Sequence, residues 1–515
     1  MSGSLRMPPG TYEDTLPYVP RQRRPPNWAQ PDPIEELAER LGEFIAAAVH
    51  PDEIAALLES DGMSDDQIRR RYGVKNSFAL AEELYERVER HYPEPEGPAH
   101  DPWRLGLLGC LLRGVVFALP GLGYVLGAPL LAGPKGEFGL PAGTVPLLAG
   151  ALCGWTWNQG LAHRAYSWLG LGDRSAARRA LLVGAPVGVL LGSLVALTAT
   201  GAAHPGTAVA FAAGQSCYLG AATVLLVMDR ERALLGVLSP MAAGAVLALV
   251  HPVPDLARAV LLLGSLVAVA LLALLEVAPA VRELGEGSWG AGLTALLPFG
   301  NLRGAADGPA RPDAPRPAAA APWLTGSLPY ALFGLGSGVL VLYAALGDVL
   351  ARAHSAVAAP AAVALTLSMG PAEWLLFRFR SGSLAGLRSS STSKDFWRTT
   401  AITLVQCLTG YLVALLALSL AASALWPHAP ATTGGVRLAG LLLLGVVLWT
   451  GLLLQSFGAV TSAAVVCCVA ALAQTAALAA HAGSPHWVGL IVYGAAAGAQ
   501  AGLVCGLLGR ATAHR

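Results

Sequence analysis

The chain has 515 residues, of which 54% are hydrophobic and only 13% are charged, and its formal net charge is +1 at pH 7. A mean hydropathy of +0.54 is too high for a soluble protein of this length, so the composition excludes that class and predicts an integral membrane protein. The first 100 residues hold 19 of the 33 acidic and 11 of the 34 basic residues, a net charge of −8, whereas the remainder holds 14 acidic and 23 basic residues. We therefore expect an acidic segment outside the membrane, followed by a slightly basic membrane domain.

The acidic segment is predicted to have two parts. Residues 1–31 are rich in Pro, Arg and Gln and lack the apolar core of a secretory signal, which is typical of a disordered leader. Residues 32–100 predict a small cytosolic helical domain, in which Asp32 caps a helix that begins with Pro33, and Ser64 and Gln67 form a capping box. Its acidic charge argues against nucleic acid, which needs a basic surface. We expect a docking or regulatory module, with a cytosolic glycosyltransferase as its candidate partner.

The rest of the chain is dominated by apolar stretches of about 20 residues, the length at which a helix crosses the hydrocarbon core. Twelve such stretches are predicted to be transmembrane helices: 105–131, 141–163, 178–200, 206–228, 233–252, 257–278, 324–346, 353–376, 399–422, 435–454, 457–480 and 486–509. A Pro- and Ala-rich stretch at 279–323 is predicted to be a cytosolic linker. It divides the membrane domain into a six-helix bundle at 104–278 and a second at 324–510. The fold class is thus an all-α polytopic membrane protein.

The charges of the loops predict how these helices are oriented. With the amino terminus inside, the inside loops and the carboxyl tail hold seventeen Arg and Lys residues, whereas the outside loops hold four: Lys135, Arg258, Arg352 and Arg437. Because basic residues concentrate on the cytoplasmic side of membrane proteins, both termini are expected to be cytoplasmic. We expect a multi-pass protein of the cell membrane, in contact with its lipids.

A glycine-broken apolar segment occurs twice, as "FALPGLG" at 117–123 and as "YALFGLG" at 330–336. A second pair, "LAHRAYSWLGLG" at 161–172 and "LLFRFRSGSLAG" at 375–386, follows at almost the same offset. Since each half holds an even number of helices, the two halves are expected to be parallel repeats. The first helix of each half is predicted to bend at glycine and proline, with close packing of small residues as the open alternative. The candidate hinge residues are Pro120, Gly121, Gly123, Gly334, Gly336 and Gly338.

The six-plus-six layout and the basic stretch "RAYSWLGLGDRSAARRALLVG" after the second helix resemble the multidrug/oligosaccharidyl-lipid/polysaccharide flippase superfamily. The resemblance covers residues 104–510, and its best local motif comprises Gly172, Asp173, Ala176, Arg178 and Arg179. Within the superfamily, the cytosolic extension and the size are most similar to the membrane component of Pel-type exopolysaccharide export, although the extension departs from a minimal flippase. The resemblance implies a V-shaped cavity between two six-helix bundles, which opens alternately to each face.

Polar and ionisable side chains inside the bilayer are costly, so they are candidate functional residues. Arg113 lies about eight residues into the first predicted helix and can bind an anionic substrate or reach the inner headgroups. The second helix supplies Asn158, Gln159 and His163, and its counterpart in the second half carries Glu373 at the position of Gln159. These five residues are the predicted cavity. The candidate cytosolic mouth is Arg164, Arg378 and Arg380, whose alternative role is to anchor the topology.

No enzymatic motif stands out in the chain. It has no P-loop, no HExxH and no GxSxG, and its seven cysteines show no metal-ligand spacing, so we expect neither an enzyme nor a cofactor or metal. Three functions stay open. The first is a flippase or exporter of a polysaccharide or lipid-linked sugar; the second is a non-transporting scaffold of an exopolysaccharide synthesis complex; the third is a drug/cation antiporter, which Arg113 disfavours.

Overall fold

The computed structural model describes residues 32–61, 63–89, 106–132, 140–200, 206–285, 324–350, 359–390, 392–425 and 435–508. In these ranges the regular elements are all helical, and the chain divides into two compact units, Met1–His100 and Asp101–Arg515. The predicted leader at 1–31 lies outside the described residues, as does the predicted linker from residue 286 onward. Residues 279–285 belong to helix α11 (Asp255–Gly285), which contains Pro279 and ends seven residues past its predicted end at residue 278.

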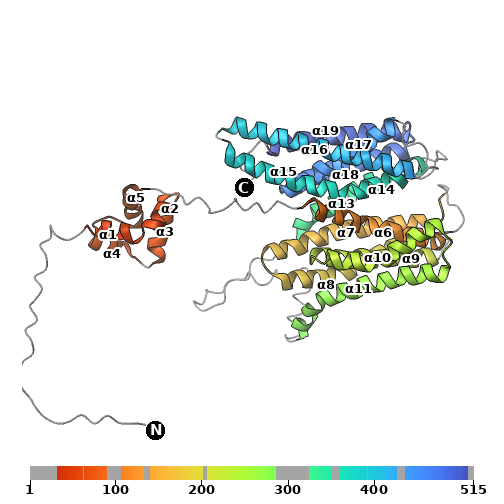
Figure 1. Ribbon diagram of the computed structural model, residues 1–515, viewed down its shortest axis with the longest axis horizontal. Helices are drawn as coiled ribbons and strands as arrows, with labels where there is room; N and C mark the ends of the chain where they lie inside the picture. Colours follow the sequence, from red (N-terminus) through yellow and green to blue (C-terminus); the bar gives the residue numbers. More distant parts are fainter. Residues whose placement is uncertain are drawn as a thin grey trace, which may run out of the picture. The chain divides into compact units, whose positions relative to one another are not determined.

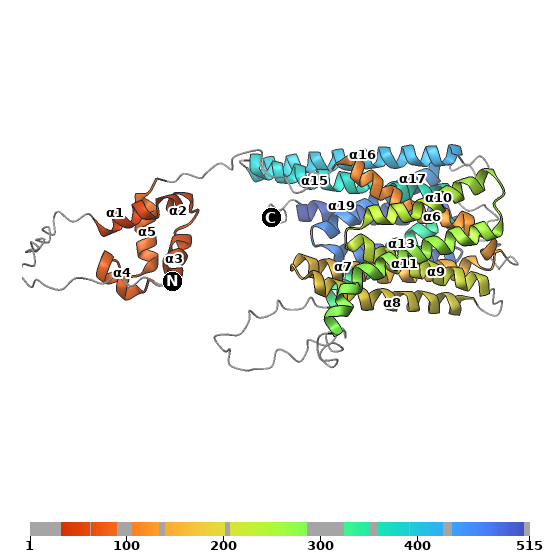
Figure 2. The ribbon, with the colours of Figure 1, turned by 60° about the horizontal axis from the view of Figure 1, so that its bottom comes forward.

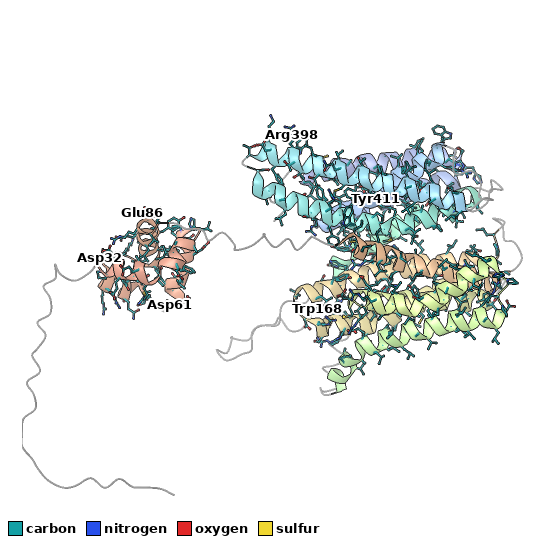
Figure 3. The ribbon with its side chains drawn as sticks, viewed as in Figure 1. Asp32, Asp61, Glu86, Trp168, Arg398 and Tyr411 are labelled. Carbon is teal, nitrogen blue, oxygen red and sulfur yellow. The ribbon has the colours of Figure 1, made fainter. Side chains whose placement is uncertain are left out.

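The first unit contains five short helices: α1 (Pro33–Arg40), α2 (Gly42–Ala47), α3 (Pro51–Ser60), α4 (Asp65–Tyr72) and α5 (Ser77–Arg87). Asp32 caps α1 by accepting a hydrogen bond from the Ile34 amide at 3.0 Å, and the Ser64 amide donates to the Gln67 side chain at 3.0 Å at the start of α4. The amphipathic helices bury a small apolar core whose largest fully buried side chains are Ile45, Ile54, Leu58, Ile68, Leu80 and Leu84. Charged side chains such as Asp61 and Glu86 lie on its outside (Figure 3).

The second unit is built of long apolar helices. Eleven segments of the described chain are long and apolar enough to cross a membrane. They are α6 (Leu107–Leu131), α8 (Arg174–Ala199), α9 (Gly206–Val227), α10 (Glu231–Val250), α11 (Asp255–Gly285), α13 (Leu328–Leu350), α14 with α15 (Ala359–Leu367 and Met369–Ser389), α16 (Ser393–Leu425), α17 (Gly435–Ser456), α18 (Val460–Ala479) and α19 (Pro485–Leu508). The prediction of an all-α polytopic membrane protein is confirmed.

The remaining predicted span is α7 (Thr144–Gly170), a helix of 27 residues that is not among those eleven segments. At about 1.5 Å per residue it is about 40 Å long, which is enough to cross a bilayer. Its hydropathy is reduced by Asn158, Gln159, His163 and Arg164. Because α7 packs against α8, α9 and α13, these polar groups lie among helices. Hydropathy alone therefore understates the ability of α7 to cross a bilayer.

Each half of the second unit has its own apolar core. Leu181, Leu225 and Val269 are buried in the first half, and Phe379, Leu444 and Trp449 in the second. The two groups of helices lie side by side, with α6 and α7 on the face of the first half that meets α13, α14 and α15 (Figures 1 and 2). Large apolar side chains elsewhere on the surface are exposed, as Leu190 and Leu256 are at 70% and 77%, which suits contact with lipid.

Candidate functional site at the seam between the two halves

The two halves meet along two helix pairs, α6 with α14 and α15, and α7 with α13; we call this contact the seam. The first pair is a close crossing of glycines. A Cβ placed on Gly114 would lie 2.9 Å from the backbone of Gly370, and one placed on Gly370 would lie 2.8 Å from the carbonyl oxygen of Cys110. The chain around Gly370 is interrupted between α14 and α15, where Pro371 has no N–H to offer the Leu367 carbonyl. Only glycine allows the helices this approach.

Charged side chains cluster beside this crossing. Arg113, one residue before Gly114 on α6, forms ion pairs with Glu231 at the start of α10 and with Glu373 on α15. The distance from Arg113 Nε to Glu231 Oε1 is 2.5 Å, and Arg113 Nη1 donates to Glu373 Oε1. The three side chains are 31%, 23% and 22% exposed, so this seam cluster is partly accessible. Two of the predicted cavity residues, Arg113 and Glu373, are thus brought together across the two halves.

The second helix pair places two further predicted residues at the seam. His163 on α7 stacks on Tyr330 of α13 with ring centroids 3.7 Å apart, and its Nδ1 is 3.1 Å from the Ser327 hydroxyl. Gln159 lies one turn away against Gly334, where a Cβ would come within 2.8 Å of the Gln159 side chain. The contact along α7 and α13 is therefore lined with polar groups rather than with apolar side chains alone.

The other predicted residues lie apart from the seam cluster. Asn158 is 9% exposed, and its Oδ1 has no hydrogen-bond partner among the described residues. At the predicted cytosolic mouth, the Arg378 guanidinium lies 5.4 Å from the Trp374 ring and that of Arg380 lies 5.1 Å from the Phe457 ring. Arg164 is half-buried on α7. The aromatic contacts hold two of the three mouth residues along the surface of the second half.

The candidate hinge residues fall into two groups. A Cβ on Gly334, Gly336 or Gly338 would lie 2.8 Å from a neighbouring helix, which favours the close-packing interpretation in the second half. In the first half, Pro120 lies inside a continuous α6, a Cβ on Gly121 would meet nothing within 4 Å, and one on Gly123 would lie 3.4 Å from Met241. Bending at these residues stays a prediction.

Sequence reasoning did not single out two acidic residues that the structure places in ion pairs. Glu231 joins the seam cluster, and Glu276 on α11 is 8% exposed and binds three arginines. We call these four residues the inner cluster: Glu276 pairs with Arg178 at 3.0 Å, with Arg230 at 2.9 Å and with Arg174 at 3.7 Å. The sequence could have indicated this ion pair, because Glu276 is a lone acid in the apolar run "LLALLEVAPA" and a buried carboxylate needs a cation.

The loop that carried the family resemblance joins α7 to α8. Gly172 has φ +79, which glycine adopts without strain, and Asp173 caps α8 by accepting a hydrogen bond from the Ala176 amide at 2.7 Å. Burial raises the pKa of Asp173. The hydrogen bonds from Ala176 and Ser175 and the charge of Arg179 together lower it by more, so the pKa lies below its ordinary value. Gly172 and Asp173 of the motif therefore form this turn and the start of α8.

No protein-family model matches the chain, and a comparison with curated proteins finds no similar one. Among the described residues, no group of three or more His, Cys, Asp or Glu side chains is placed to hold a metal ion. The fold and the site define a multi-pass helical membrane protein in which charged and polar side chains gather where its two groups of helices meet.

Proposed function

We propose that the protein is a membrane flippase or exporter that moves a polysaccharide or a lipid-linked sugar by alternating access between its two groups of helices. Its termini are cytoplasmic in this proposal, and its first unit recruits a cytosolic synthetic partner. The single observation that carries the proposal is the seam cluster, in which Arg113 of one half holds Glu373 of the other. Charges are expensive inside a bilayer, so an ion pair at the boundary between the two groups of helices favours a functional role for that boundary.

The chemistry of the seam supports a sugar substrate. Gln159, His163 and Ser327 offer amide, imidazole and hydroxyl groups, which can exchange hydrogen bonds with sugar hydroxyls when the helices part. Arg113 can transfer from Glu373 to a carboxylate or phosphate of the substrate, because both are anions that match its planar donors. The ion pair would then close the seam when substrate is absent and give way when substrate is bound.

The arrangement of contacts favours movement of two similar bodies. The first membrane helix of each half, α6 or α13, touches the second helix of the other half, α15 or α7. Reciprocal contacts of this kind suit two parallel repeats related by an axis along the membrane normal. Tilting of the two halves about an axis parallel to the membrane plane would separate both helix pairs together at one face.

Thiol accessibility tests the proposal directly. Gln159→Cys and Glu373→Cys would each be placed in a chain cleared of its seven native cysteines and probed from either face with an impermeant maleimide. The matched control retains only native Cys467, which is fully buried in the core of the second half. We expect both seam cysteines to be labelled from both faces, and Cys467 from neither. Protection of the seam cysteines from both faces, in folded protein, would favour the scaffold.

A further inference from the structure

The inner cluster lies at one end of the first group of helices. Arg174 begins α8, Arg230 caps the start of α10, and Glu276 lies on the last part of α11. Helices α8 and α11 pack against each other (Figure 1). Since α8 and α10 are each long and apolar enough to cross a membrane, the arginines at their first turns lie at the depth of the phospholipid headgroups.

Three guanidinium groups share one carboxylate in this cluster. Arg174 and Arg178 both approach Oε1 of Glu276, at 3.7 and 3.0 Å, and Arg230 donates from Nε to Oε2 at 2.9 Å. Positive charges that gather at one carboxylate repel one another. Apart from a hydrogen bond of 3.4 Å from Arg174 to the Met228 carbonyl, these arginines make no other ion pair or hydrogen bond with the described residues. A second anion would therefore stabilise them.

The charged side chains that are nearest in sequence leave this positive excess in place. Arg179 pairs with Asp173, at 3.9 Å. Asp229 and Arg232 carry opposite charges and are both exposed. Glu231 belongs to the seam cluster, where it forms its own ion pair.

The cluster is closed on its inner side and open on its outer side. Glu276 is 8% exposed and Arg178 22%, whereas Arg174 and Arg230 are 54% and 56% exposed. The buried carboxylate thus holds the arginines in place, while the outer two keep N–H donors available to a ligand. The planar donors of arginine match the oxygens of a phosphate group, which they can bind in pairs.

A stripe of exposed apolar side chains runs along α11 away from the cluster. Leu275, Leu271, Val267 and Leu263 follow one another at intervals of one helical turn, and each is more than half exposed. At about 1.5 Å per residue this stripe is about 18 Å long, close to half of a hydrocarbon core of about 30 Å. An acyl chain whose headgroup lay at the cluster could follow it.

We propose that the inner cluster binds the phosphate of an anionic membrane phospholipid, with an acyl chain of that lipid along the stripe on α11. A headgroup such as phosphatidylglycerol is favoured over phosphatidylcholine, because the choline ammonium would offset the phosphate charge beside the arginines. A free phosphate would meet the same arginines but would leave the stripe unused. Binding here does not depend on the transport proposed above, because the inner cluster and the seam cluster share no residue.

Native mass spectrometry of the delipidated full-length protein in an uncharged detergent tests this assignment. The protein is titrated with phosphatidylglycerol or with phosphatidylcholine of the same acyl chains. We expect the first molecule of phosphatidylglycerol to bind at least about tenfold more tightly. Inorganic phosphate at equal concentration should not displace it. Equal affinity for the two lipids would overturn the proposal, and displacement by inorganic phosphate would assign the cluster to a free anion instead of a lipid.

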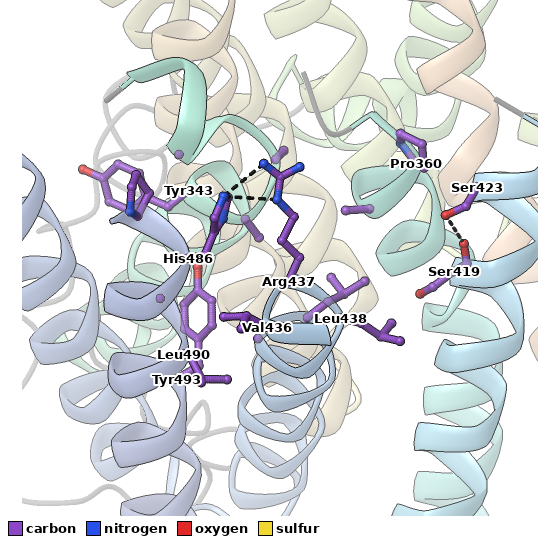
Figure 4. A pocket seen from close by; sticks show the side chains of 18 of the residues that line it. Tyr343, Pro360, Ser419, Ser423, Val436, Arg437, Leu438, His486, Leu490 and Tyr493 are labelled. Atoms are coloured by element: carbon purple, nitrogen blue, oxygen red, sulfur yellow. Dashed lines mark hydrogen bonds between the residues drawn. The ribbon is translucent and has the colours of Figure 1, made fainter. Parts of the chain in front are cut away.

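Variants locate the binding at the cluster. Arg174→Gln combined with Arg230→Gln removes both exposed guanidinium groups and should weaken phosphatidylglycerol binding at least about tenfold, to the level of phosphatidylcholine. The matched control is Arg437→Gln, which removes an arginine of the second half that donates to His486 (Figure 4) and should leave the preference unchanged. If the double variant does not fold, each single variant decides, with a loss of at least about threefold expected. An unaltered preference for phosphatidylglycerol in the folded variants would contradict the assignment.

Discussion

The seam cluster and the inner cluster contain the same kinds of side chain in different settings. In the seam cluster, Arg113 joins Glu231 of its own half to Glu373 of the other, and all three are more than 20% exposed. In the inner cluster, Glu276 is 8% exposed and gathers arginines from α8 and from the turn before α10, all within the first half. The two clusters are adjacent in sequence at Arg230 and Glu231. The difference indicates that one set of charges stabilises a bundle, whereas the other joins two bundles.

The largest expected effect is the loss of the inner cluster. Glu276→Gln keeps the size of the side chain and leaves three arginines without their carboxylate, and breaking a buried ion pair costs about 3–5 kcal/mol. Since Arg174 and Arg230 are 54% and 56% exposed, water screens part of this loss. We expect a decrease in stability of about 2–3 kcal/mol, measured as the midpoint of denaturation in detergent. An unchanged midpoint would remove the structural role given to this cluster.

Two glycines allow the packing at the seam to be compared with the packing inside one half. Gly114→Ala would place a methyl group 2.9 Å from the Gly370 backbone at the seam, and Gly336→Ala would place one 2.8 Å from the Cys467 backbone inside the second half. Because backbone cannot move aside as a flexible side chain does, each should destabilise the protein by about 1–3 kcal/mol. Gly121→Ala, with nothing within 4 Å, should be neutral.

The readout that distinguishes these glycines is accessibility. Gly114→Ala should raise maleimide labelling of a cysteine at position 159, because it pushes the two halves apart, whereas Gly336→Ala should lower stability with little change in labelling. If both variants raised labelling equally, the seam would not be the weaker boundary.

Much of the fold follows from local sequence, and much of the site does not. Apolar runs fix the long helices, and Asp32 with Pro33 fixes the start of α1, because these signals act within a few residues. Arg113 and Glu373 were identifiable singly as charges within apolar helices, yet their pairing joins positions 260 residues apart, which helix periodicity cannot report.

A smaller stability effect is expected at the seam cluster. Glu373→Gln leaves Arg113 paired with Glu231, so the loss of stability should stay within about 1 kcal/mol. Labelling of a cysteine at position 159 should nevertheless increase, because the remaining ion pair lies within one half. Asp255→Asn, an exposed acid at the start of α11, is the matched control and should change neither quantity. A stability loss as large as that of Glu276→Gln, with unchanged labelling, would make the seam cluster structural too.

The smallest effect belongs to an exposed ion pair in the first unit, where Arg87 donates to Asp32 at 2.7 Å and the two side chains are 38% and 41% exposed. The hydrogen bond from Arg87 lowers the pKa of Asp32, so its contribution to stability is present above the unfolded-state pKa and is lost as the pH falls through the lower folded-state value. Asp32→Asn keeps the helix cap but carries no charge at any pH. Hydrogen exchange of residues 33–40 in the full chain should therefore be slower in the native protein than in this variant at pH 6. The two rates should converge below pH 3; a difference that persisted there would have to come from the cap rather than from the charge.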